Sequence, residues 1–450
     1  MRFGFAFLLT VFVNVHAFCQ PNRQIKNDAA MLQSAEKILT GVIIHDIFSP
    51  PVASRIYVYA NIAAYEILAQ DDTSCKSLYG IVQSLPAIAA PTGKISFPLA
   101  AVYSFLLTGK KLVFSETVVQ DSINSILNAY KRTNLSNAVY NASLDYGRKV
   151  SEEIIRWAVG DHYNETRSLK RYQFIKKEGS WIPTPPGYIA AIEPYWNRIR
   201  TLAMDSACQF KPYAAVPFNK DKTSQFYKEA YEVYEVGKTL TTAQRNIANF
   251  WDCNPFFLNI EGHVNFASKK ISPGGHWISI AGILARQHNA GIMKTSAVYT
   301  YVSIALFDAF ISCWDEKYRS NVIRPETYIN SYIDESWRPL LQTPPFPEYP
   351  SGHSVASNAA AIVLTSIFGP ASSFTDDTEV EFGLPVRKFS SIIEAANEAT
   401  ISRLYGGIHY RAAIEHGRTQ GVNIGDLVVK KIVDKTFLVE HFDRNALLKN

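Results

Sequence analysis

Apolar residues recur at steps of three and four through most of the chain, and this spacing predicts amphipathic helices. A first set of such segments lies before a proline-rich stretch at residues 181–196, and comprises residues 28–46, 52–70, 97–107, 117–130 and 139–159. A second set follows that stretch, and comprises residues 224–236, 242–251, 277–288, 295–314, 354–368, 385–403 and 414–437. Alternation of apolar and polar residues, which would predict strands, is not convincing anywhere.

The two sets of segments predict an all-α protein made of two helical bundles. We expect an N-terminal bundle at residues 20–200 and a C-terminal bundle at residues 201–450, joined near residues 181–240 and sharing one core. The composition agrees with this, because 47% of the 450 residues are hydrophobic and 13% are aromatic, which is enough for a large packed interior.

The charge of the chain is modest and evenly spread. The net charge is +5, and the basic residues are scattered rather than gathered in a run. A surface that binds nucleic acid is therefore not expected. The slight excess of positive charge is compatible with an anionic substrate.

Residues 1–19 resemble a secretory signal peptide. Arg2 provides the positive start, an apolar stretch follows over residues 3–15, and Ala17 offers a small residue near a cleavage point. One alternative is an N-terminal membrane anchor, although the apolar run is short for a span. The other is a lipoprotein at Cys19, where the preceding residue is a bulky phenylalanine. We expect a secreted or periplasmic protein with no membrane span after removal of the signal.

Four cysteines remain after that removal, namely Cys75, Cys208, Cys253 and Cys313. An oxidising compartment permits disulfides, and four cysteines allow three pairings between which the sequence does not choose. The spacing of the cysteines is too wide for a local zinc knuckle.

Three short segments in the second half of the chain carry candidate chemistry. The first follows the apolar segment 295–314 and holds Lys317 and Arg324, the latter directly before Pro325. Because proline disfavours the helical conformation in the residue before it, the helix must end before Arg324. The guanidinium can then donate a bidentate pair of hydrogen bonds to an oxyanion, and Lys317 adds a point charge. Alone, such a pattern is more often a solvated basic helix end.

The second segment is a proline-rich loop, residues 345–350, that runs into an apolar helix. Ser351 or Ser354 suits the helix N-cap, and Gly352 lets the backbone approach a ligand closely. The first N–H groups of such a helix form an anion site, and His353 stands at its mouth, able to give or take a proton. The alternative is an ordinary capped helix start.

The third segment contains Arg403 and His409 on either side of Gly406 and Gly407. Two glycines allow a sharp turn after a helix, and that turn can direct Arg403 and His409 toward one point. The alternative is a helix C-terminus whose dipole stabilises His409. Together, the three segments supply three cations, a hydroxyl, a glycine N–H and two histidines, which suits a tetrahedral oxyanion such as vanadate or phosphate.

These segments resemble a known superfamily. The spacings Lys-x6-Arg-Pro, Pro-Ser-Gly-His and Ser-Arg-x5-His are similar to those of the group that joins type-2 phosphatidic acid phosphatases, bacterial acid phosphatases and vanadium-dependent haloperoxidases. Trp314 and Phe346 stand where haloperoxidases typically carry aromatic residues. Other segments that look like this branch are residues 181–186, 250–252 and 275–277. Within it, the chain is most similar to bacterial haloperoxidases and iodoperoxidases.

The resemblance implies a haloperoxidase- or acid-phosphatase-like fold and an enzyme that oxidises a halide, iodide or bromide, to hypohalous acid with hydrogen peroxide and vanadate. It implies that His409 coordinates vanadium and that His353 takes a proton when peroxide binds. The groups that would hold the oxygens of the cofactor are Lys317, Arg324, Ser351, the N–H of Gly352 and Arg403. Trp314 and Phe346 would line the halide side, and phosphate has the shape to occupy the same site. The organic acceptor stays unknown.

Two other functions stay open. A phosphomonoesterase or lipid-phosphate phosphatase would use the same residues, with His409 as nucleophile and His353 protonating the leaving oxygen. Phosphatase relatives usually carry aspartate four residues after that nucleophile, where this chain has Ala413. The imidazole partner of His409 is therefore unassigned, with a backbone carbonyl as one candidate. The third function is non-catalytic anion binding, against which the complete residue set argues.

Other notable residues are expected to have structural roles. Glu348 is expected to be a surface charge and Arg411 to make an ordinary salt bridge, while Asp252 could pair with a site arginine or be structural. His276, His288 and His416 have no partners at ligand spacing and are expected in the core or on the surface. Phe256 and Phe257 are expected to be core residues rather than a substrate site.

Overall fold

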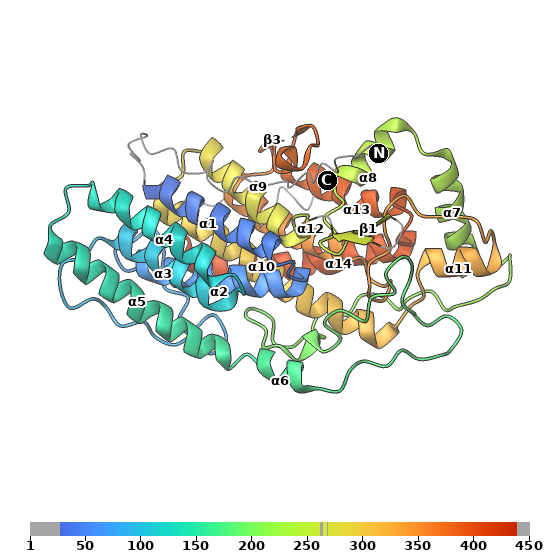
Figure 1. Ribbon diagram of the computed structural model, residues 1–450, viewed down its shortest axis with the longest axis horizontal. Coiled ribbons are helices and arrows are strands. Elements are labelled where there is room, and N and C mark those ends of the chain that lie inside the picture. Colours follow the sequence, from blue (N-terminus) through green and yellow to red (C-terminus); the bar gives the residue numbers. More distant parts are fainter. Residues whose placement is uncertain (1–27, 262–263, 268, 439–450) are drawn as a thin grey trace, which may run out of the picture.

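The computed structural model describes residues 28–261, 264–267 and 269–438, and most of their regular structure is helical. The helices run roughly side by side in an elongated body, with α1 to α5 toward one end and α7 and α11 at the other (Figure 1). The predicted all-α fold is therefore confirmed. The expected signal peptide, residues 1–19, lies outside the described residues.

The N-terminal group of helices comprises α1 (Asp28–His45), α2 (Pro50–Leu68), α3 (Phe97–Leu112), α4 (Glu116–Lys131), α5 (Asn137–Val159) and the short α6 (Tyr163–Ser168). Serine N-caps begin three of them, since Ser49, Ser96 and Ser136 each accept the backbone N–H three residues on. The first five helices start within two residues of the predicted segments, because periodicity and caps agree there.

The C-terminal group comprises α7 (Gln225–Thr239), α8 (Thr242–Phe250), α9 (Pro273–Gln287), α10 (Ile292–Ser320), α11 (Pro325–Tyr332), α12 (Gly352–Phe368), α13 (Ile392–Tyr405) and α14 (Arg411–Val428). A π-helical turn, η4 (Val429–Val433), and α15 (Asp434–Thr436) continue α14. Two one-turn 3-10 helices are η2 (Trp196–Arg198) and η3 (Val380–Phe382). The pair α12 and α14 packs closely, and α13 covers both.

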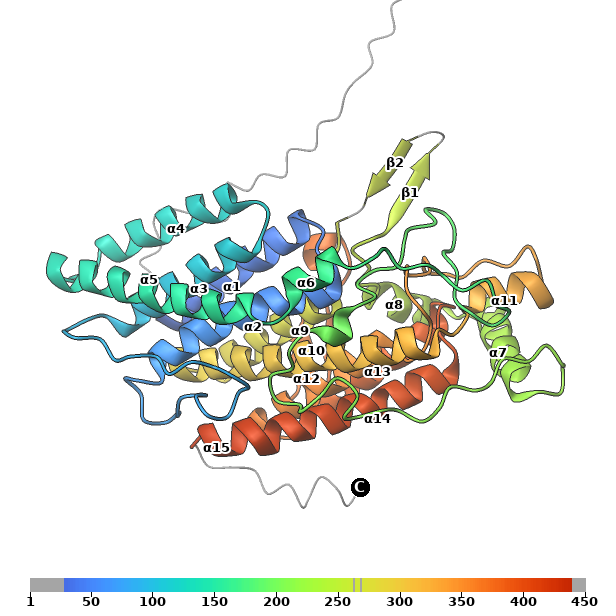
Figure 2. The same cartoon turned by 90° about the horizontal axis from the view of Figure 1, so that it is seen from below.

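Helix α10 is the element that the two groups share. It contacts α1 and α2 of the first group and α9, α12 and α14 of the second, and Figure 2 shows it running along the middle of the body. One hydrophobic cluster extends from Met31 in α1 to Phe437 after α15. The expected boundary near residue 200 thus falls in a chain segment that packs on this common core.

Within the described chain, α10 is also the one helix that is long and apolar enough to cross a membrane by length and composition. Its most apolar window is completely buried inside the protein, as in the core helix of a globular domain. The apolar surface of α10 therefore already has protein partners.

The structure differs from the sequence prediction in two short hairpins. Antiparallel β1 (Leu258–Glu261) and β2 (Val264–Ala267) form one, and β3 (Phe374–Asp376) and β4 (Arg387–Phe389) form the other. The predicted helix 385–403 is wrong in its first turns, because α13 begins only at Ile392, where Ser391 accepts the N–H of Glu394. Strands of three or four residues are too short to produce a recognisable alternation.

The four cysteines that the structure describes are all free. Cys75, Cys253 and Cys313 are buried, whereas Cys208 is exposed. The disulfide pairings that the sequence permits are therefore not formed.

Candidate functional site

The first predicted segment brings two cations into the core at the end of α10. The helix ends at Ser320, where Asn321 adopts a left-handed conformation, and Arg324 follows in extended backbone as the cap of α11. Both Lys317 and Arg324 are fully buried. Their side chains are therefore not solvated at a helix end, and their positive charges must be balanced by groups inside the protein or by a bound ligand.

The second segment places the start of α12 at the same point. The Ser351 hydroxyl oxygen accepts the N–H of Ser354 at 3.3 Å, so Ser351 is the N-cap. Gly352 and His353 open the helix, where backbone N–H groups have no carbonyl partner within the helix. The positive end of α12 thus faces the pocket.

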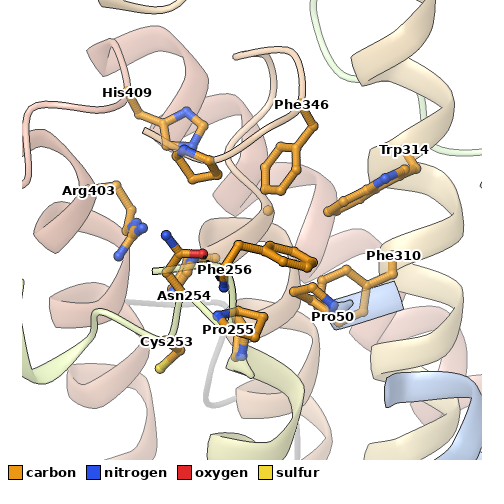
Figure 3. A pocket seen from close by; sticks show the side chains of 14 residues that line it. Pro50, Cys253, Asn254, Pro255, Phe256, Phe310, Trp314, Phe346, Arg403 and His409 are labelled. Atoms are coloured by element: carbon orange, nitrogen blue, oxygen red, sulfur yellow. Dashed lines mark hydrogen bonds between the residues drawn. The ribbon is translucent and has the colours of Figure 1, made fainter. Parts of the chain in front are cut away.

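The third segment turns where predicted. Helix α13 ends at Tyr405, and Gly407 has a φ of +76°, a left-handed conformation that glycine adopts without strain. The turn leaves Arg403 and His409 directed toward the same pocket, on the side opposite Phe346, Trp314 and Phe310 (Figure 3).

The seven polar residues therefore meet at one place. Gly352, His353, Arg403 and His409 line the pocket directly. Arg324 lies behind His409, with its Nη1 3.2 Å from His409 Nε2. Ser351 caps the same helix start, and Lys317 binds the loop that precedes it.

Three buried nitrogen atoms around this pocket have no hydrogen-bond partner. They are Nη2 of Arg324, Nε of Arg403 and Nε2 of His353. The rest of each side chain is fixed: Arg324 donates to the carbonyls of Phe346 and Ile408 at 2.9 Å, and Arg403 donates to the carbonyl of Trp251 at 2.9 Å. Unpaired buried polar atoms are costly. Two arginine donors and an imidazole nitrogen around one pocket therefore mark a place for a polyvalent oxyanion that can also exchange a proton.

Glu348 corrects two expectations from the sequence. It is not a surface charge but almost completely buried, and its Oε1 lies 2.8 Å from Nδ1 of His409. The same oxygen accepts the N–H of Tyr410 at 3.0 Å. The guanidinium Nη1 of Arg324, 3.2 Å from Nε2 of His409, can only donate, so Nε2 accepts its N–H and the proton of the neutral ring lies on Nδ1, facing Glu348. The unassigned partner of His409 is thus a carboxyl group from the proline-rich loop.

The electrostatics of the pocket keep both histidines neutral. Burial and then the positive charges of Arg324 and Lys317 hold the pKa of His409 well below its ordinary value. Burial and Arg403 lower the pKa of His353 in the same way. Burial raises the pKa of Glu348 to about 8, and Arg324 and Lys317 act in the opposite direction. A neutral His409 offers a lone pair, and a neutral His353 can accept a proton.

Lys317 makes different contacts from those expected. Its Nζ donates to the carbonyls of Pro347 at 3.0 Å and Glu348 at 3.1 Å, and also to the carbonyl of Pro350. An ammonium group has three donors, so these carbonyls use all of them. Burial lowers the pKa of Lys317 to about 7. The side chain therefore fixes the loop before α12, and it can reach an oxyanion only by releasing a carbonyl.

An aromatic wall faces the polar groups. The rings of Trp314 and Phe346 have centroids 4.9 Å apart, and both line the pocket with Phe310. Lys317 Nζ and the Arg324 guanidinium each lie 5.1 Å from the Phe346 ring centroid. The Phe346 ring therefore packs against two buried cations and lines the pocket.

Of the remaining residues, Asp252 and Arg411 have structural roles that the sequence analysis allowed, whereas Phe256 departs from its expected role. Asp252 pairs with Lys270 rather than with a site arginine, although its charge still acts on Arg403. Arg411 makes an ordinary salt bridge with Glu232. Phe256 is not a core residue alone, since it is partly exposed and lines the pocket.

Comparison with known proteins identifies the family. A family model described as the VCPO second helical-bundle domain matches residues 297–436. The crystal structure of a bacterial vanadium-dependent iodoperoxidase is similar over 90% of this chain and 96% of that chain, with 48% sequence identity and a TM-score of 0.85. This chain belongs to the vanadium-dependent haloperoxidase family. It is accordingly an enzyme of that type.

Two structures of a bacterial vanadium-dependent chloroperoxidase resemble this haloperoxidase in fold. The holo form has 14% identity and a TM-score of 0.63, and covers 93% of this chain and 95% of its own. The apo form has 16% identity and a TM-score of 0.63, and covers 86% and 94%. A search of curated protein sequences found no match.

Sequence reasoning missed three parts of this haloperoxidase site. Glu348 stands in the same loop as Ser351, but its direction depends on the fold. Asn254 and Trp251 come from the turn after α8, about 100 residues before the motif, where Asn254 lines the pocket and the carbonyl of Trp251 holds Arg403. Every residue has a backbone carbonyl, so the sequence does not indicate which carbonyl contacts a site residue.

Proposed function

We propose that this enzyme is a vanadate-dependent haloperoxidase that oxidises iodide with hydrogen peroxide to hypoiodous acid. The observation that carries the proposal is one pocket at which two unpaired buried N–H donors, of Arg324 and Arg403, meet the unpaired Nε2 of His353 and the unprotonated Nε2 of His409. Vanadate has the charge and the four oxygens that these groups require. Bound vanadate would supply a Lewis acid that activates peroxide toward the halide.

His409 is the residue that we assign to the metal bond. Glu348 keeps the proton on Nδ1, so the lone pair of Nε2 points into the pocket. A free ligand nitrogen must give up its present contact, which is the 3.2 Å approach of Arg324 Nη1. When Nε2 of His409 binds the metal, the guanidinium of Arg324 can donate the released N–H to an oxygen of the oxyanion.

His353 is the residue that we assign to proton transfer. Its Nε2 is buried and unpaired, and its low pKa keeps the ring neutral. It can therefore accept a proton from incoming hydrogen peroxide and return it later. Arg403 and the first N–H groups of α12 would hold oxyanion oxygens beside it.

Iodide is the halide that we propose, because the relative with 48% identity is an iodoperoxidase. The aromatic wall of Trp314 and Phe346 offers a polarisable surface next to buried positive charge. Such a surface suits a large, weakly hydrated anion more than a small one.

The test is to load the purified protein with orthovanadate and to measure peroxide-dependent oxidation of iodide and bromide. We expect iodide oxidation only after loading. Arg403→Ala should abolish it, whereas Arg411→Ala, which removes an arginine eight residues away in a surface salt bridge, should leave it. Equal loss in both variants, or no oxidation after loading, would contradict the proposal.

A phosphatase is the second candidate, and Glu348 is the observation that favours it. A carboxyl group on Nδ1 makes Nε2 of His409 a better nucleophile, and this compensates for Ala413. Hydrolysis of a phosphate ester by the vanadate-free protein, without any iodide oxidation by the loaded protein, would reverse the order of the two candidates.

We also propose that the protein is exported by residues 1–19. The support is the sequence alone, with a basic start and a short apolar stretch. Expression of the full chain in a bacterial host, followed by N-terminal sequencing of the periplasmic fraction, tests this. A mature N-terminus near residue 20 is expected, and an intact chain in the cytoplasm would contradict export.

A further inference from the structure

A second cluster of ligand-type side chains lies beside the oxyanion pocket and belongs to none of the predicted segments. Cys253 follows α8, His276 stands in the first turn of α9, and Glu379 precedes η3. All three are buried, with exposures of 2%, 0% and 4%. Glu379 is more than 100 residues from the other two in the chain, so the fold brings distant segments together.

The distances in this cluster match those around a tetrahedral metal. Cys253 Sγ lies 3.4 Å and Glu379 Oε1 3.2 Å from His276 Nδ1, and Sγ and Oε1 are 4.0 Å apart. Zinc binds thiolate at about 2.3 Å and imidazole or carboxylate at about 2.0–2.2 Å, so its ligand atoms stand roughly 3.3–3.7 Å apart. The three atoms need to move by only a few tenths of an ångström.

The neighbours of Nε2 in His276, on the side of the ring away from Cys253 and Glu379, require a proton on that nitrogen. Nε2 lies 2.8 Å from Asp376 Oδ2 and 2.7 Å from Thr378 Oγ1. The Thr378 hydroxyl donates to the other oxygen of Asp376 at 2.7 Å, so both neighbours act as acceptors of Nε2–H. In the neutral ring, Nδ1 then has a lone pair that faces a carboxylate oxygen and a sulfur, and these three atoms can be joined either by a proton or by a metal ion. A carboxylate on the outer nitrogen is a frequent arrangement around histidine ligands of zinc.

We propose that Cys253, His276 and Glu379 bind a structural zinc ion that is separate from the vanadate site. Binding releases the thiol proton of Cys253 to solvent, and the thiolate, the carboxylate and the neutral imidazole then balance the divalent charge. Three protein ligands leave the fourth position to a solvent molecule, which can arrive from the pocket that Cys253 lines. A borderline-soft ion is favoured because one ligand is sulfur.

This ion would hold the turn that orients the oxyanion site. The carbonyl of Trp251, two residues before Cys253, accepts the Nη1–H of Arg403 and also bonds His353. The Trp251 ring stacks on His276 with centroids 4.6 Å apart. Fixing Cys253 to His276 therefore fixes the backbone that positions two residues of the proposed active site.

The experiment counts metals in the untagged, full-length protein purified without chelators. We expect about one zinc per chain in the wild type and in Cys75→Ala, which removes another buried cysteine. Cys253→Ala should retain less than about a tenth of that zinc. Because the measurement uses neither vanadate nor halide, its outcome is independent of the peroxidase proposal.

A second measurement covers the case in which Cys253→Ala does not fold. Zinc is removed from the wild type with a chelator and replaced by cobalt(II), and the absorption spectrum is recorded. A thiolate-to-cobalt charge-transfer band, together with a rise in Tm on adding zinc, is expected. No stoichiometric zinc and no such band would overturn the proposal, and would assign the cluster to a doubly protonated His276 between Asp376 and Glu379.

Discussion

The Nδ1 atom of His409 decides how this imidazole can act. With its proton on Nδ1, facing Glu348, the ring has an unprotonated Nε2, which accepts from Arg324 Nη1 in this structure, and His409 and Glu348 are both nearly inaccessible to solvent. The same carboxyl group accepts the N–H of Tyr410, so it is held in place by the chain that it orients. Glu348 is therefore a positioning residue for the metal bond.

Glu348→Ala should weaken vanadate retention by about 10- to 100-fold, as loss of a partner behind a metal ligand does in other sites. The imidazole loses the group that selects its tautomer, and Glu348→Gln should lose less because its amide oxygen still accepts. Vanadium retained after dialysis, and the orthovanadate concentration that restores half of the activity, measure the effect. Glu232→Ala, at a surface salt bridge, is the control. Unchanged retention in Glu348→Ala would show that the tautomer does not depend on this contact.

His353→Ala should separate binding from turnover. The variant keeps His409, Arg324 and Arg403, so vanadium content should stay close to that of the wild type. Loss of a general acid–base group typically lowers kcat by about 10²- to 10⁴-fold. Vanadium analysis alongside the rate of iodide oxidation checks both parts, and an unchanged kcat would be incompatible with the assigned proton transfer.

Among the elements, α10 connects the helical framework to the site. Lys317 stands in its last turn, and Asp308, about two and a half turns earlier, accepts the N–H groups of Leu202, Ala203 and Met204, each at 2.8 Å. The segment after η2 is therefore tied to the same helix that carries the site lysine. The carboxylate of Asp308 accepts the backbone N–H groups of this irregular segment, which in a helix or a strand would be bound by backbone carbonyls.

Asp308→Ala should destabilise the protein by about 3–5 kcal/mol, because three buried N–H groups lose their acceptor and each costs about 1–3 kcal/mol. Asp308→Asn keeps one oxygen acceptor and should lose less. Thermal unfolding of both variants measures the difference. A Tm of Asp308→Ala within a degree of the wild type would show that solvent can reach this segment.

On the scale of the whole molecule, the fold encloses an excess of positive charge. Lys317, Arg324 and Arg403 are fully buried, whereas two buried carboxyl groups act on them, Glu348 on the first two and Asp252 on Arg403. The field of these cations and the loss of water both prevent His353 and His409 from being protonated. An anion in the pocket would reduce the electrostatic repulsion among these buried positive charges. Vanadate binding should therefore stabilise the folded protein.

The vanadate-free protein should therefore lose stability as the pH falls below about 6.5. In the unfolded chain both imidazoles take a proton near that pH, whereas in the folded chain their lowered pKa values prevent it. The unfolded state then binds more protons, at up to about 1.4 kcal/mol per pH unit for each histidine. Tm measured between pH 7.5 and 5.5 should fall less steeply in His353→Gln than in the wild type. Equal slopes would show that His353 titrates normally in the folded protein.

The sequence alone determined the helical class, most helix positions and the three segments that form the oxyanion pocket. Periodicity and caps are local properties, so α1 to α5 could be placed within a few residues. The residues Lys317, Arg324, Ser351, Gly352, His353, Arg403 and His409 were identified because their spacing is a family pattern. The spacing of these residues does not predict which atoms each side chain contacts.

The tertiary structure decided the contacts that depend on distant segments. Glu348 turned from an expected surface charge into the partner of His409, and the donors of Lys317 were found on loop carbonyls. Cys253, His276 and Glu379 meet only because α8, α9 and the chain before η3 pack together. Burial and side-chain direction follow from how elements pack, and residue types along one chain do not encode them separately.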